Sequence, residues 1–169
     1  NETDYLLKDL DMIAYVEKMD DILVCLKKVD VVFINKNTFG DTVITAFWKS
    51  NNEYFKLDVL LCNKMPNICE KDIYGKKCYV VTASYVWRNR IEKIAEREIR
   101  MHDDKKTLNH YMVARKLSQY LVENKGIIHE EDCIAVEMKL PEVQEVLSKL
   151  VVLSELEQFM NLQFELVKG

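Results

Sequence analysis

Apolar residues recur at two different spacings along this chain, and the change of spacing divides it into predicted helices and strands. Residues 3–19 place Leu6 and Leu10 at a helical interval, and Thr3 stands where a hydroxyl caps a helix start. This pattern predicts an amphipathic N-terminal helix. Residues 20–28 either continue that helix or form a second short one.

Alternation with a period of two follows and predicts four strands. The first three predicted strands are rich in β-branched and aromatic residues and cover residues 29–36, 41–49 and 53–62. Short turn-forming stretches separate them, which predicts an antiparallel β-meander. A loop at residues 66–75 leads to a fourth predicted strand at 77–87, and the alternation at 133–138 suits one further edge strand.

Helical spacing returns in the second half of the chain and predicts three helices. Residues 88–101 form the first, and residues 107–126 form the second, with Thr107 as its cap and Gly126 as its left-handed end. Pro141 opens the third at the first helical position, where proline is favoured, and this helix runs to about residue 153 or 160.

Strands in one block followed by helices in another predict an α+β fold. We expect an antiparallel β-meander of about four strands, with an N-terminal helix and several C-terminal helices packed on the sheet. The last stretch, residues 161–167, fits either a strand or a helix. No linker rich in Pro, Gly or Ser interrupts the chain, which predicts a single globular domain over residues 1–169. The start at Asn1, without an initiator methionine, favours a domain excised from a longer protein.

The composition restricts the class of protein. Hydrophobic residues make up 49% and charged residues 31% of the chain, a balance that excludes a disordered protein. No apolar run reaches the roughly 18 residues of a membrane span, so we expect a soluble globule without a membrane partner. The net charge of −4 gives no overall attraction to nucleic acid or to acidic membranes.

Three of the five cysteines, Cys62, Cys69 and Cys78, lie close together in the chain. Structural zinc sites take cysteines in pairs two to four residues apart, and the gaps here are wider. Several cysteines also occupy apolar strand or helix positions, where cysteine behaves as a small hydrophobe. We therefore expect reduced thiols without a metal or other cofactor, with a disulfide among the three or a metal site as the alternatives. Reduced thiols favour a cytoplasmic or nuclear location.

Four basic residues form a stripe within about 80° of one face of the predicted helix 88–101. These residues, the basic stripe, are Arg90, Lys93, Arg97 and Arg100. Residues 88–116 hold nine Lys or Arg against five Asp or Glu, a local net charge of +4. Because the whole chain has a net charge of −4, the rest of the chain carries −8. Such a stripe predicts a site for a partner or an anion such as a nucleic-acid phosphate, and an ordinary solvated helix face is the alternative.

No motif in the chain reaches the specificity of a catalytic signature. Phosphate-binding glycine loops and the serine nucleophile elbow are absent from the sequence. The pair His102 and Asp103 lacks the earlier histidine that metal phosphohydrolases need. Asp58 lacks an acidic residue on the next predicted strand, which a metal nuclease would use, and is expected to form a cross-strand ion pair. We assign no catalytic residue.

Three classes of function remain. We expect a non-enzymatic intracellular interaction or regulatory module, whose partner is another protein or a second copy of this chain. A nucleic-acid-associated protein that uses helix 88–101 is the alternative, and an enzyme whose site is hidden in a single sequence is the second alternative. An open sheet edge or an apolar helix face such as Val146, Leu150 and Leu153 would carry the interaction.

Overall fold

The structure is a computed structural model, and it describes residues 9–37, 40–99 and 104–169. The chain forms two compact units: unit 1 ends at Met65 and unit 2 runs from Pro66 to Gly169. The predicted α+β class is confirmed, since helices and strands are both present in separate blocks. The single globular domain over the whole chain stays a prediction.

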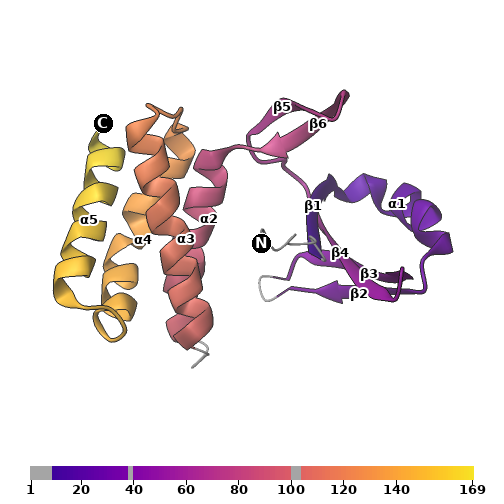
Figure 1. Ribbon diagram of the computed structural model, residues 1–169, viewed down its shortest axis with the longest axis horizontal. Helices are drawn as coiled ribbons and strands as arrows, with labels where there is room; N and C mark the ends of the chain where they lie inside the picture. Colours follow the sequence, from indigo (N-terminus) through magenta and orange to yellow (C-terminus); the bar gives the residue numbers. More distant parts are fainter. Residues whose placement is uncertain (1–8, 38–39, 100–103) are drawn as a thin grey trace. The chain divides into compact units, whose positions relative to one another are not determined.

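Unit 1 is a four-stranded mixed sheet with one short helix (Figure 1). Its elements are β1 (Asp9–Tyr15), η1 (Val16–Lys18), α1 (Met19–Cys25), η2 (Leu26–Lys28), β2 (Val31–Lys36), β3 (Thr42–Ser50) and β4 (Glu53–Cys62). The strands lie in the order β1-β4-β3-β2, with β1 parallel to β4 and the other neighbours antiparallel. The three strands predicted first and the short second helix are confirmed.

Strand β1 overturns the helix predicted at residues 3–19, for the part of that range that the structure describes. The residues of β1 also alternate, so that Leu10, Met12 and Ala14 share one face and lie opposite the apolar residues of β4. Pairing with β4 supplies hydrogen-bond partners along the whole strand, and this outweighs the local helical spacing. The sheet is therefore not the antiparallel meander that we predicted, because β1 joins it in parallel.

Helix α1 covers one face of this sheet and closes the core of unit 1. The fully buried members are Ile44 of β3 and Val59 and Leu61 of β4, and Ile22 and Leu23 of α1 pack against them. The alternation of the strands places these residues on the same face. The core of unit 1 is thus built between the sheet and the segment that links β1 to β2.

Unit 2 begins with a β-hairpin and continues as four helices (Figure 1). Its elements are β5 (Ile68–Ile73), β6 (Lys76–Val81), α2 (Ala83–Ile99), α3 (Asp104–Glu123), α4 (Glu130–Ser148) and α5 (Leu153–Lys168). The loop predicted at residues 66–75 is wrong, because most of this segment forms strand β5. The turn that joins β5 to β6 uses Tyr74 and Gly75, both with positive φ. The predicted fourth strand ends early because the Thr82 hydroxyl accepts a hydrogen bond from the Tyr85 amide and starts helix α2.

Helices α2 and α3 confirm the first two predicted helices, with different ends. Thr107 is not the cap of α3 but a buried residue inside it. The left-handed residue after α3 is Lys125, with φ of 46°, and not Gly126. The amide of Gly126 instead donates to the carbonyl of Leu121 at 2.9 Å, which closes the end of the helix.

Helix α4 corrects two predictions, the edge strand at residues 133–138 and the helix start at Pro141. Both segments lie within this one helix. Its buried residues continue at helical spacing on both sides of the proline, and they include Val136, Leu140 and Val143. Packing of this continuous stripe outweighs the backbone hydrogen bond that the proline lacks. Residues 161–167, left open between strand and helix, are helical in α5.

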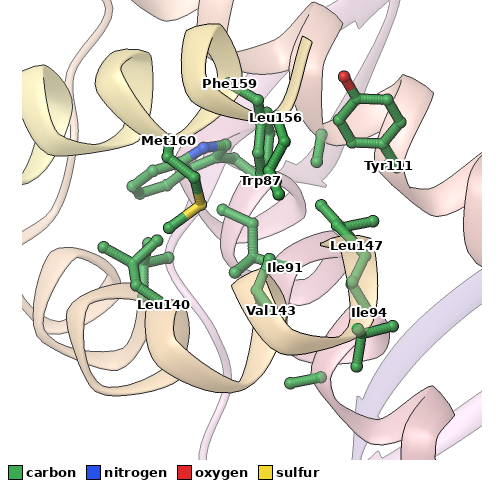
Figure 2. Packing of buried hydrophobic residues seen from close by; sticks show 14 of the residues in the cluster. Trp87, Ile91, Ile94, Tyr111, Leu140, Val143, Leu147, Leu156, Phe159 and Met160 are labelled. Carbon is green, nitrogen blue, oxygen red and sulfur yellow. The ribbon is translucent and has the colours of Figure 1, made fainter. Parts of the chain in front are cut away.

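The four helices bury their apolar faces against one another, and Figure 2 shows the centre of this core. All the fully buried members of the core belong to α2, α3, α4 or α5, with Trp87 and Phe159 the largest of them. The packing of these helices on the sheet stays a prediction. No described helix combines the length and the apolar character needed to cross a membrane.

Candidate functional site

The structure describes the side chains of two of the four residues of the predicted basic stripe, Arg90 and Lys93. Arg90 is half-buried, and its Nη1 lies 3.3 Å from Nδ1 of His110 on α3. Lys93 forms an ion pair with Glu96, with 3.1 Å between Nζ and Oε2. The side chain of Arg97 and the whole of Arg100 lie outside the described part. The stripe therefore stays a prediction, and its two described cations already contact groups of unit 2.

The remaining two cations of the stripe give it a direct test. If the stripe neutralises about four duplex phosphates, the affinity for mixed nucleic acid falls with salt with a log–log slope of about −3 to −4. We expect the double variant Arg97→Glu and Arg100→Glu to lose retention on a nucleic-acid column at low salt. The same charge change at the exposed Lys105 and Lys116 is the control. A native chain that is not retained at low salt contradicts the nucleic-acid alternative.

A second group of charges, which the sequence did not reveal, joins the starts of α2 and α4. Asp132 is 1% exposed and accepts a hydrogen bond from the Ser84 hydroxyl at 2.7 Å. Its other oxygen lies 3.1 Å from Nη1 of Arg88, and Arg88 also lies 3.6 Å from Glu92 through Nε. The buried Nε of Arg88 makes no hydrogen bond and has only this longer contact with Glu92. All four residues lie within unit 2 and contact one another, so we assign this group a structural role.

Glu92 in this group gives a prediction on pH dependence. Burial raises the pKa of Glu92 above its usual 4.5, and the nearby Arg88 guanidinium only partly opposes this. A raised carboxyl pKa means that the folded protein holds the proton more tightly than the unfolded chain. The resulting stabilisation is present below pH 4.5 and is lost as the pH rises through the raised pKa.

We therefore expect Glu92→Gln to remove part of this pH dependence. The free energy of unfolding of the variant should fall less between about pH 4 and about pH 7 than that of the native chain. Urea unfolding followed by circular dichroism at several pH values measures the difference. Glu137→Gln, at an exposed position of α4, is the control and should follow the native profile. Parallel profiles for Glu92→Gln and the native chain would contradict the assignment.

Two of the three clustered cysteines, Cys69 and Cys78, lie in unit 2 on one β-hairpin. Cys69 and Cys78 lie on the same face of the β5–β6 hairpin, but Cys69 is opposite Val80, so the two cysteines are diagonal neighbours. Diagonal Cα atoms are about 7–8 Å apart, beyond the roughly 4.4–6.8 Å that a disulfide spans. Burial raises the pKa of the thiols of Cys62 and Cys133, which weakens them as nucleophiles at neutral pH.

Asp9, Asp11 and Asp58 form an acidic cluster between β1 and β4. Their carboxylate oxygens lie within 4.8 Å of one another, and in the described part of the chain this is the one such group of three or more His, Cys, Asp or Glu. Lys56 pairs with Asp58 at 2.5 Å and with Asp9 at 3.6 Å. The hydrogen bond with Asp58 raises the pKa of Lys56, so this ammonium supplies positive charge to the cluster. Asp58 is thus an ion-pair partner as predicted, but of Lys56 on its own strand.

The predicted apolar face of the C-terminal helix is divided between core and surface. Val146 is buried and Leu150 packs against the core of unit 2, so neither is open to a partner. Leu153 is 67% exposed and is the first residue of α5. The intramolecular use of the first two residues leaves no continuous apolar face there.

The outer edge of β2 is the most apolar open strand edge in unit 1. No described strand pairs with its outer side, because β2 is the last strand in the order. Val31, Phe33 and Ile34 are 42%, 50% and 53% exposed, although such residues favour burial. The five residues from Val31 to Asn35 carry no charge. Charges stand only at the two ends, Asp30 before the strand and Lys36 at its last position.

Strand β1, at the other edge of the sheet, is protected in the usual way. Its exposed apolar residues Leu10 and Met12 alternate with the charged Asp9 and Asp11. Charged side chains on an edge strand oppose pairing with another chain, and β2 has none within its first five residues. The uncharged run is visible in the sequence, but only the strand order shows that it forms an edge.

Asp30 and Phe33 are held in place by their neighbours in unit 1. The carboxylate of Asp30 accepts a hydrogen bond from the amide of Lys49 at 2.7 Å. Phe33 contacts Phe47 edge to face, with 6.3 Å between the ring centres. This edge is therefore preorganised, which lowers the entropy lost when a partner binds.

Comparisons of the chain with protein-family models, with curated proteins and with solved structures found no match.

Proposed function

We propose that this chain is a non-enzymatic interaction module that binds a protein partner by strand addition at the outer edge of β2. The observation that carries this proposal is the uncharged, apolar strand β2 with no described neighbour on its outer side. An added strand would satisfy the backbone N–H and C=O groups of that edge, and side chains on both faces would gain apolar contacts.

The two faces of β2 give such a partner two different surfaces. Val32 and Ile34 lie opposite Ala46 and Ile44, which are fully buried on the face that α1 covers. Phe33 points to the other face, beside Phe47. A partner strand with apolar residues at alternate positions would extend the core on one face and contact the aromatic pair on the other.

The test is capture of a partner with the native chain and with edge variants. Phe33→Lys introduces a charge at the centre of the edge and should abolish capture, because an added strand would bury that charge. Val24→Lys is the matched control, since Val24 is an exposed apolar residue of α1 and lies off the edge. A partner that binds the native chain and Phe33→Lys equally well would contradict the proposal.

A further inference from the structure

We propose that the strand added at β2 is β2 of a second copy of this chain, paired antiparallel and centred on Phe33. This inference rests on the proposed function and names its partner. Two copies related by a two-fold axis perpendicular to the sheet would form one continuous sheet across the edge, a closed and self-complementary contact.

Side-chain alternation restricts the registers that such a pair can adopt. Residues directly opposite in an antiparallel pair point to the same face, so each residue must face a residue of the same parity in the second copy. The two-fold axis therefore passes through a residue that faces itself. In the register centred on Phe33, Val32 faces Ile34 of the second copy and Val31 faces Asn35.

The charges at the ends of β2 select this register. With Phe33 at the centre, Asp30 faces Lys36 of the second copy, and the same pair recurs at the other end by symmetry. Opposite charges placed across two strands stabilise the pairing, and like charges destabilise it. With Ile34 at the centre, Lys36 would face the apolar Val32, and with Val32 at the centre it would lie beyond the partner strand.

Apolar contacts on both faces favour the same arrangement. Val32 of each copy would face Ile34 of the other beside the buried Ile44, which would continue the core of unit 1 across the edge. Phe33 would face Phe33 of the second copy, next to the Phe47 ring. A single strand pair is smaller than the roughly 1,600 Å² of a standard interface, so the dimer should be weak and concentration-dependent.

Charge exchange tests the partner and the register together. Asp30→Lys alone would place two lysines opposite each other at both ends of the contact, and Lys36→Asp alone would place two aspartates there. Each variant should dimerise about tenfold to a hundredfold more weakly than the native chain. An equimolar mixture of the two variants restores opposite charges at both ends and should dimerise as the native chain does.

Sedimentation equilibrium of the full chain from about 1 μM to several hundred micromolar measures these affinities. The matched control is the mixture of Asp20→Lys and Lys28→Asp, which carries the same net charges at exposed positions off the edge. The Asp30 hydrogen bond to Lys49 is lost in both copies of an Asp30→Lys dimer, in one copy of the mixed dimer and in neither copy of a Lys36→Asp dimer, so weaker dimerisation of Lys36→Asp reports the charge repulsion without this loss. The two control variants and their mixture should dimerise as the native chain does. Weaker dimerisation of Asp30→Lys and of Lys36→Asp, with recovery in their mixture, supports the inference.

A disulfide at the two-fold axis checks the register independently, in a Cys25→Ser background that removes the exposed native thiol. Phe33→Cys should cross-link two copies, since opposite Cα atoms lie about 4.5–5.5 Å apart. Asn35→Cys should not cross-link them, because position 35 of one copy faces position 31 of the other. The two introduced cysteines would then lie four residues apart along the strand, about 13 Å. A monomeric native chain, or a dimer in which neither the mixture nor Phe33→Cys behaves as stated, overturns the self-pairing. Partner capture that depends on Phe33 would still support the proposed function in either case.

Discussion

Replacing Trp87 with alanine is expected to lower the free energy of unfolding of unit 2 by about 3–5 kcal/mol, the range for truncating a large buried aromatic residue. Trp87 is fully buried among residues of all four helices (Figure 2). Its indole Nε1 donates to the side chains of Ser118 at 3.0 Å and Gln163 at 2.7 Å. The substitution thus leaves a cavity and removes the donor that links α2 to α3 and α5.

Urea unfolding followed by circular dichroism measures this loss, because the helices of unit 2 contribute strongly to that signal. Trp87→Phe keeps an aromatic ring and removes only the donor, so it should cost less, about 1–3 kcal/mol. Val122→Ala, at a partly exposed position of α3, is the control for truncation and should change stability by no more than about 0.5 kcal/mol. A loss below about 1 kcal/mol for Trp87→Ala would contradict the packing described here.

Replacing Asp132 with alanine is expected to cost about 3 kcal/mol, near the lower end of the range for breaking a buried ion pair. Asp132 is 1% exposed, whereas its partner Arg88 is 23% exposed and keeps some contact with solvent. The variant also leaves the hydroxyl of Ser84 without its carboxylate acceptor. Most of the loss therefore comes from the charge and the polar group that remain.

The double variant Arg88→Met with Asp132→Ala separates this cause from simple loss of packing. Removing both charges should recover part of the stability lost in Asp132→Ala, because no unpaired buried charge remains. Equilibrium unfolding of the two single variants and the double variant gives the coupling energy. Glu137→Ala, on the exposed side of α4, should be close to neutral. Additive losses in the cycle would show that the ion pair is not the reason for the effect.

The sequence by itself determined those elements whose periodicity has only one reading. Strands β2, β3 and β4 are rich in β-branched and aromatic residues and are separated by turn-forming residues, and α2 and α3 repeat apolar residues at helical spacing over several turns. The uncharged run in β2, with opposite charges at its ends, is equally visible in the sequence. These features depend on neighbours a few residues away, so local patterns are enough to predict them.

The tertiary structure decided the elements whose local pattern has two readings. Residues 9–15 suit a helix or a strand, and β4 becomes their pairing partner although it lies more than forty residues further along the chain. Residues 133–138 alternate like a strand but complete the buried stripe of α4. The contacts of Arg90 with His110 and of Arg88 with Asp132 join residues far apart in sequence. Only the strand order makes β2 an edge, because a strand's position in a sheet depends on every other strand.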